Sequence, residues 1–155
     1  MVPIANLTIE WGAGNVATNA APTDGVFFRY QASDQTLRCV ICFAGVETSS
    51  AAIAFTEIDE YHDWDITVDN DEVRFEHDGE EIAEIATPEG QPYPVNSTRL
   101  PIFFRVFNGS SGPAQAGQVS VGRMVATQLV VNQNRPWSHT LILMGRSGYQ
   151  SPVTP

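Results

Sequence analysis

The chain has 155 residues, of which 43% are hydrophobic, and its formal net charge is −10. This length predicts one domain that buries a core without disulfides or metal ions. All eight basic residues are arginine, which excludes the lysine chemistry of phosphate-binding loops and Schiff bases. The acidic balance disfavours non-specific binding to nucleic acid, because such binding needs a cationic face. We therefore expect no nucleic-acid partner.

No segment predicts export or membrane insertion. The N-terminal residues 1–4 lead directly into alternating sequence, without the basic region and apolar run of a signal peptide. No apolar run approaches the roughly 20 residues that a membrane-spanning helix needs. We therefore expect no membrane partner.

Alternating apolar residues and turn-forming residues predict strands through the first third of the chain. The first expected strand covers residues 4–11 and is closed by the residues 12–15, Gly12-Ala13-Gly14-Asn15. The next covers 25–30, and a hairpin about Ala44 and Gly45 follows. That hairpin joins strands 36–43 and 46–50. Residues 51–55 are ambiguous between a strand and a connector.

The stretch 61–85 predicts three short strands joined by two tight turns. Asp78 and Gly79 are typical of a two-residue hairpin loop, because both tolerate the positive φ angles of a type I′ turn. The two turn lengths predict one register, with the acids on turns and the wet face. On the core face this register predicts a row formed by Ile66, Phe75 and Ile82.

Cys39 and Cys42 form a CxxC pair. Redox or zinc chemistry would place such a pair at a helix start or on a knuckle with further ligands. Here the pair lies in a strand pattern, where residues three apart face opposite sides. We interpret both as structural free thiols, with Cys39 in the core, in agreement with production in a cytoplasm.

The second half predicts fewer strands. Residues 87–99 predict a loop, 100–107 predict a central strand because they are apolar on both faces, and 119–131 predict a long strand. No segment predicts a helix of three turns or more. Many short strands separated by turns indicate an all-β, antiparallel β-sandwich with little or no helix. We assign the sandwich domain to 1–131 and an extended C-terminal segment to 132–155, with continuation beyond Pro155 left open.

Two resemblances follow from these residues. The stretch GVFFRY, a hairpin, DWDITV and VRFEHDGEEIAEI resemble the concanavalin-like jelly roll of the laminin-G and legume-lectin superfamily, over residues 25–131. The segment QVSVGRMVATQLVVNQNRPWSHTLILMGRSG is similar to a segment of tailed-phage virion structural proteins. The second resemblance implies a location in the virion after synthesis in the host cytoplasm. It also implies partners that are copies of the chain and other virion proteins.

The glycosidases of the superfamily carry Glu-x-Asp-x-x-Glu on one strand, and the sequence matches only its first half. Glu57-Ile58-Asp59 fits, but His62 stands where the second glutamate is needed, and Tyr61 stands there in a shorter variant. Without the second carboxylate there is no retaining mechanism. We therefore expect no enzyme activity and no catalytic residue.

Metal and cofactor sites are not predicted. Lectin-type calcium sites need oxygens that converge from loops, whereas the adjacent side chains of 69–71 diverge. The three histidines, His62, His77 and His139, share no ligand spacing along the chain. We expect no metal and no cofactor.

Arg135 and Trp137 are the candidate interface residues, because Arg and Trp are enriched in binding hot spots. Packing on the chain's own domain and contact with another subunit both stay open. The charge distribution favours contact between copies: residues 57–89 hold 14 acids and one base, and 90–155 hold five arginines and no acid. Arginines of one copy would then meet acids of another.

The sequence thus predicts a non-enzymatic phage virion structural protein, associated with capsid or tail, that forms a homo-oligomer. The alternative is a carbohydrate-binding module for receptor or surface-glycan attachment. Trp11, Trp64 and Tyr93 are the candidate aromatic platforms for a glycan in that alternative, although Trp64 alternates with the core residues.

Overall fold

The computed structural model describes residues 7–15, 20–57, 60–69, 71–87 and 100–108, and the short stretches 120–121, 128–130, 139–141 and 145–148. The regular structure of these residues consists of β-strands, with no helix among them. In this part of the chain no helix is long and apolar enough to cross a membrane. The prediction of an all-β fold is confirmed.

Sheet A is antiparallel and has the strand order β4-β3-β2-β1-β9, with β5 paired to β3. Its order places β1 between β2 and β9. The strands are β1 (Leu7–Gly14), β2 (Gly25–Gln31), β3 (Thr36–Phe43), β4 (Val46–Ser49), β5 (Ile53–Ala54) and β9 (Ile102–Asn108).

Sheet B is also antiparallel and has the order β10-β13-β6-β7-β8. A separate pair, β11-β12, completes the described strands. The bounds are β6 (His62–Val68), β7 (Glu72–His77), β8 (Glu80–Ala86), β10 (Ser120–Val121), β11 (Gln128–Val130), β12 (His139–Leu141) and β13 (Gly145–Gly148).

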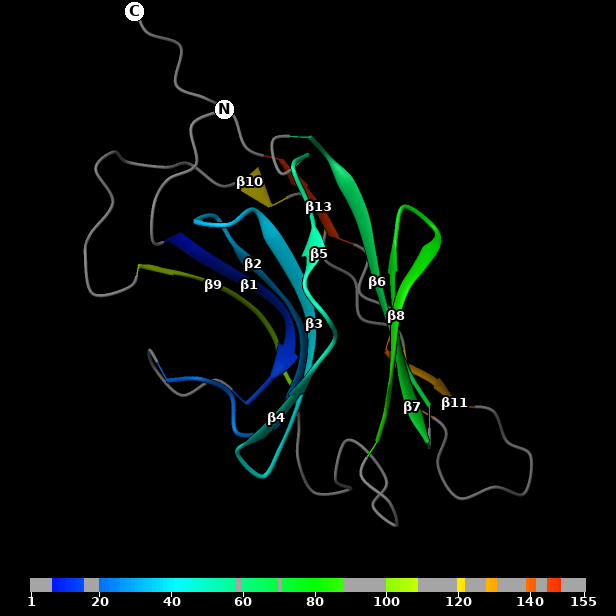
Figure 1. Cartoon of the computed structure of the whole chain (residues 1–155). Helices are drawn as coiled ribbons and strands as arrows, with labels where there is room; N and C mark the ends of the chain where they lie inside the picture. Colours follow the sequence, from blue (N-terminus) through cyan, green and yellow to red (C-terminus); the bar gives the residue numbers. More distant parts are fainter. Residues whose placement is uncertain are drawn as a thin grey trace, which may run out of the picture.

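The two sheets pack as two layers (Figure 1), and aromatic side chains fill the space between them. Phe28 of β2 lies at the centre of this core. Its ring centroid is 5.4 Å from that of Trp11 in sheet A, and 4.9 Å and 5.3 Å from those of Trp64 and Phe75 in sheet B. Contact between inner faces through interdigitated side chains is the packing of a β-sandwich.

The β6–β8 meander confirms most of the predicted register. Asp78 and Gly79 have φ angles of 51° and 81°, as a type I′ turn requires, and Ile66 pairs with Phe75. Ile82 packs against the core as predicted, but its predicted pairing with Phe75 is wrong, because Phe75 pairs with Ala83 across a β-bulge. A regular register would place Glu84 opposite the buried Val73.

The bulge resolves a conflict in the β8 sequence. Ile82 and Ile85 are three residues apart, so a regular strand would direct them to opposite faces. One extra residue shifts the register, and Ile85 then pairs with Val73. Both are buried, at 8% and 0% exposure.

The prediction that the first strand is closed from Gly12 onwards is wrong, because β1 continues to Gly14. Gly12 is a position at which the backbone of β2 leaves no room for a side chain on β1. A Cβ atom at Gly12 would lie 2.3 Å from the carbonyl oxygen of Val26 and 2.6 Å from Cα of Phe27. The glycine therefore permits the strand pairing instead of ending it.

We expect Gly12→Ala to lower the free energy of unfolding by about 3 kcal/mol, the upper end for overpacked sites. The clash is with backbone atoms, so only a shift of strand β2 relieves it. Urea unfolding followed by tryptophan fluorescence measures the loss. Gly45→Ala is the matched control, because a Cβ there meets nothing within 4 Å and only its positive φ adds about 1 kcal/mol. Equal losses in the two variants would contradict this packing.

The prediction of a central strand at 100–107 is wrong for the described sheet, because β9 pairs with β1 alone and ends the strand order. Its two apolar faces have another cause. Phe104 packs against the main core, whereas Phe103 packs on the outer face against Phe27, with ring centroids 5.6 Å apart. A small second apolar cluster on the outer face thus explains the pattern.

The C-terminal third contributes short strands to sheet B and to the separate β11-β12 pair. Of the strand expected at 119–131, the structure describes β10 in sheet B and β11 in the separate pair, and the residues between them lie outside the described part. Strand β13 pairs with β6, and Arg146 is the register partner of Asp63. The domain boundary at 131/132 stays a prediction, although Gly145–Gly148 belongs to sheet B.

Candidate functional site

The outer face of sheet A, which points away from sheet B, carries a charged cluster in the middle of the sheet. Cross-strand pairing produces it, because Glu10 on β1 lies opposite Arg29 on β2 and opposite Arg105 on β9. Opposite charges at directly paired positions attract across a sheet. The register of three strands therefore places two guanidinium groups on one carboxylate.

Glu10 is fully buried, at 0% exposure. Arg29 donates from Nε to Oε1 of Glu10 at 2.6 Å, and Arg105 donates from Nε to Oε2 at 2.9 Å and also from Nη2. Arg29 then donates both Nη groups to Glu47 of β4 at 2.8 Å each. The four side chains form a continuous ion-pair network, which stabilises a carboxylate that could not be buried unpaired.

Two members of the network, Arg29 and Glu47, stabilise each other's charged forms. Hydrogen bonds with Glu47, and then with Glu10, raise the pKa of Arg29. The same contact with Arg29 lowers the pKa of Glu47. Arg29 and Glu47 both stay ionised at neutral pH and present an ordered set of N–H donors and carboxylate oxygens.

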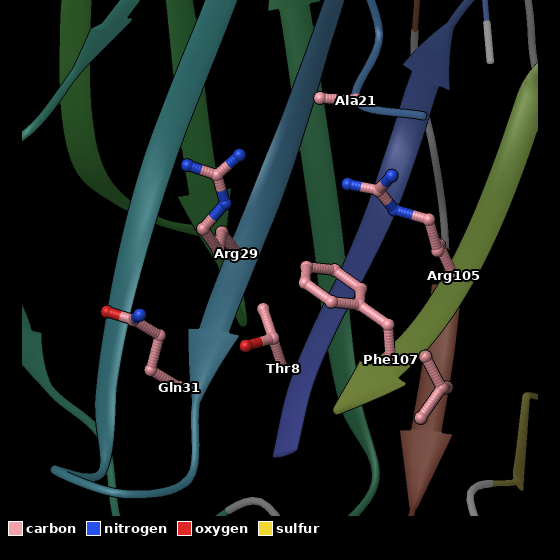
Figure 2. Close-up of a pocket in the computed structure, with 7 residues that line it drawn as sticks. Thr8, Ala21, Arg29, Gln31, Arg105 and Phe107 are labelled. Atoms are coloured by element: carbon pink, nitrogen blue, oxygen red, sulfur yellow. The ribbon is translucent and has the colours of Figure 1, made fainter. Parts of the chain in front are cut away.

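Beside the network the sheet is hollowed into a pocket of about 620 Å³. Figure 2 shows the guanidinium groups of Arg29 and Arg105 and the ring of Phe107 on this side of the sheet. The Arg105 guanidinium carbon lies 4.4 Å from the Phe107 ring centroid. The pocket thus combines an aromatic ring with two guanidinium groups that are already paired with carboxylates. The pocket is lined by Thr8, Ala21, Arg29, Gln31, Arg105, Val106 and Phe107.

The predicted interface residues Arg135 and Trp137 lie outside the described residues, as does Tyr93, so their roles stay predictions. Trp11 and Trp64 are in the sandwich core, at 6% and 1% exposure. Their suggested role as glycan platforms is therefore wrong.

Both cysteines are free, and Cys39 is buried as predicted, whereas the burial of Cys42 was not predicted. Cys39 packs in the main core, whereas Cys42 packs in the small outer cluster. Burial raises the pKa of Cys39 to about 12 and also raises the pKa of Cys42. Protonated, buried thiols are poor nucleophiles and poor metal ligands.

The outer face of sheet B carries a row of carboxylates. Asp65 pairs with Glu76, which pairs with Glu81, although like charges opposite each other are destabilising. Burial, and then the charge of Glu76, raise the pKa of Asp65. Strand β13 pairs with β6, and Arg146 is there the register partner of Asp63. A strand from the acid-free C-terminal region therefore lies beside an acidic strand of the same chain.

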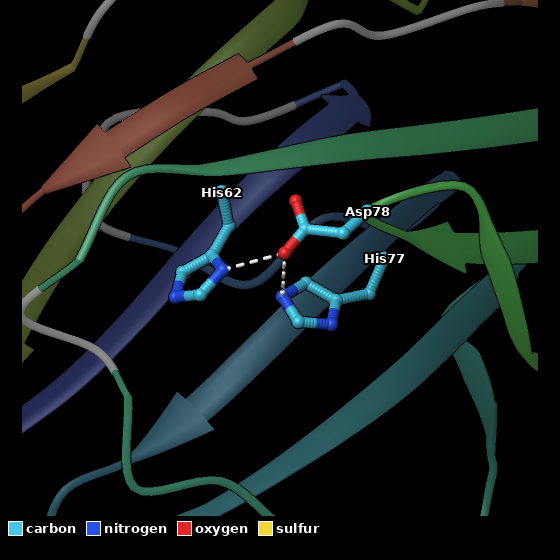
Figure 3. Close-up of side chains that lie close together, drawn as sticks. All are labelled: His62, His77 and Asp78. Carbon is cyan, nitrogen blue, oxygen red and sulfur yellow. Dashed lines mark hydrogen bonds and ion pairs between the residues drawn. The ribbon is translucent and has the colours of Figure 1, made fainter.

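A second group of side chains gathers where β6 begins and β7 ends, and it consists of His62, His77 and Asp78 (Figure 3). The inference that the histidines share no ligand spacing is wrong for this pair. Their spacing is across strands: His77 pairs with Trp64, so His62 is its diagonal neighbour on the same face. The predicted hairpin register already places His62 and His77 on the same face of adjacent strands, so their proximity could have been predicted from the sequence.

No protein-family model matches the chain, and searches of curated proteins and of solved structures return no significant match. Within the described residues the fold is all-β, with two main antiparallel sheets and a separate two-stranded pair. On the outer face of one sheet the chain carries an ordered ion-pair network and a pocket.

Proposed function

We propose that this chain is a non-enzymatic structural protein of a tailed-phage particle, and that it assembles with copies of itself through a concanavalin-like sandwich. The similarity of the C-terminal segment to virion proteins supports the location. The open edge of β9 is the observation that supports assembly. Buried, reduced thiols agree with synthesis in a host cytoplasm.

Within the described residues, no strand pairs with the outer edge of β9. This edge offers backbone N–H and C=O groups along the strand, and it exposes Val106 at 45% and Phe107 at 37%. Proteins that stay monomeric protect such edges with lysine, proline or very short strands. β9 has seven residues, and its one charged side chain, Arg105, is paired with Glu10.

A second copy is the partner that fits this edge. Two antiparallel β9 strands related by a two-fold axis would join two A sheets into one, with the same surface used on both copies. Val106 of each copy would then lose its contact with water. The pockets beside Phe107 would lie near the interface, so the arginines of the network would contribute to its orientation.

The pocket itself favours the alternative function, a carbohydrate-binding module. Phe107 offers an apolar ring, and Gln31 and Arg105 offer donors for hydroxyl groups in the same hollow. A glycan-array hit that is lost in Phe107→Ala and kept in Tyr61→Ala would favour this alternative over self-assembly.

We expect the full chain to self-associate with rising concentration in light scattering coupled to size exclusion. We expect Val106→Lys to shift it towards monomer, because pairing of two edges would bury a charge on each copy. Tyr61→Lys is the matched control, because Tyr61 is 56% exposed and lies outside the strands. A wild-type chain that remains monomeric at every concentration would contradict the proposal.

A further inference from the structure

His62, His77 and Asp78 meet at one rim of the sandwich core. His62 begins β6, His77 ends β7, and Asp78 is the first residue of the tight turn that follows. Each offers one ligand atom, and these atoms all lie within 4.8 Å of one another. Two imidazoles and one carboxylate, fixed by a hairpin register, form a donor set that divalent transition metals prefer.

The ring of His62 is oriented by a backbone group. Its Nε2 lies 2.8 Å from the carbonyl oxygen of Glu57, and a carbonyl only accepts, so Nε2 carries a hydrogen. Nδ1 therefore faces the cluster, where it donates a hydrogen bond of 2.8 Å to Oδ2 of Asp78, so a metal ion bound at Nδ1 would displace this proton. Metal-bound histidines share this arrangement, with the far ring N–H donated to a carbonyl and the near nitrogen directed at the ion.

The second imidazole aims at the same point. Nε2 of His77 lies 3.3 Å from Oδ2 of Asp78. This nitrogen is buried and makes no hydrogen bond of good geometry within the described part of the chain. A buried polar atom without a hydrogen bond costs stability, so its position calls for a ligand that the described residues do not supply.

Asp78 is held in place by the turn. Its Oδ1 accepts a hydrogen bond of 2.7 Å from the backbone N–H of Asp63, which leaves Oδ2 for the two imidazoles (Figure 3). The Asp78 side chain is 49% exposed, whereas His62 is 5% exposed. Solvent, and an ion, can therefore reach the cluster from the Asp78 side.

We propose that His62, His77 and Asp78 form a binding site for a divalent transition-metal ion, of which zinc is the representative. Nδ1 of His62, Nε2 of His77 and Oδ2 of Asp78 are the ligands. Three protein ligands leave a position of a tetrahedral ion for water or an exogenous group.

The surroundings suit a bound ion. The His77 ring lies against Trp64, with centroids 4.4 Å apart, and Phe55 contacts both imidazoles at 5.4 Å and 5.3 Å. These rings hold the imidazoles in fixed orientations and exclude water from one side. Metal–ligand bonds are about 2.0–2.2 Å long, whereas the three ligand atoms now lie within 4.8 Å of one another. Small shifts of these side chains are therefore needed, and the Asp78 side chain, which is half exposed, can move towards an ion.

Titration of the full chain with Zn²⁺ alone, followed by calorimetry, tests the site. We expect saturable binding of one ion per chain and an increase in Tm with Zn²⁺. Asp78→Asn keeps a residue that tolerates the turn conformation and removes the ligand charge. We expect it to weaken Zn²⁺ binding by more than about 10-fold, the loss that even outer-sphere partners cause.

Asp71→Asn is the matched control, because it removes one charge from the other turn of the meander, away from the cluster. We expect it to bind Zn²⁺ as the wild type does. His77→Gln is the second ligand variant, and circular dichroism without metal establishes that each variant is folded. Absence of saturable binding, or equal affinity in wild type, Asp78→Asn and His77→Gln, would overturn the proposal and leave a hydrogen-bonded cluster that stabilises the turn.

Discussion

Replacement of Glu10 by glutamine is expected to lower the free energy of unfolding by about 3 kcal/mol. Removal of one partner from a buried ion pair costs about 3–5 kcal/mol, because the remaining charge stays desolvated. Glu10 has 0% exposure and two arginine partners, but their side chains are 19% and 15% exposed and regain some hydration. The lower end of the range is therefore expected, and urea unfolding measures it.

Glu47→Gln is the control for this prediction. It removes a carboxylate from the same network, but the Glu47 side chain is 34% exposed, so the expected loss is below about 1 kcal/mol, as for surface pairs. Added salt should reduce the Glu47 contribution more than the Glu10 contribution, because buried pairs are less screened. Losses of equal size in the two variants would show that Glu10 is not the centre of the network.

Replacement of Phe28 by alanine is expected to cost about 3–5 kcal/mol, as for other buried phenylalanines. Phe28 is fully buried and touches aromatic rings of both sheets. Its loss leaves a cavity where the layers meet, and stiff surrounding strands close such a cavity only in part. Thermal and urea unfolding should both report the loss.

Phe107→Ala is the matched control for Phe28, because the same side chain is removed from a site with 37% exposure. We expect a loss below about 1 kcal/mol, since surface changes rarely exceed this. A similar loss at the two positions would contradict the assignment of the core to the space between the sheets.

Local patterns were sufficient to predict the strands in the first half of the chain. Turns with strong residue preferences, such as Asp78-Gly79, fixed both the hairpin and its register near the turn. The prediction failed where a neighbouring strand decides the outcome. Gly12 resembles a strand end in the sequence, but its role depends on how closely β2 approaches.

The bulge in β8 shows what a regular alternation rule misses. Ile82 and Ile85 cannot share a face in a regular strand, and this conflict was visible in the sequence. The buried pair of Ile85 with Val73 indicates that the hydrophobic pattern, more than the turn, sets the register at the far end of β8.

Both sites depend on pairing between strands, which explains why chain spacing did not reveal them. Glu10 and Arg105 are 95 residues apart and meet only because β1 lies beside β9. His62 and His77 are diagonal neighbours on adjacent strands. The second pair could have been derived from the predicted hairpin, whereas the first needed the order of strands in the sheet.

Hydrogen–deuterium exchange of the β9 amides at low and high protein concentration tests assembly through the open edge most directly. If β9 pairs with a second copy, exchange at Ile102–Asn108 should slow as concentration rises. Exchange in β1, which already lies inside sheet A, should stay unchanged. Exchange in β9 that is the same at both concentrations, in a chain that remains monomeric, would contradict the proposal.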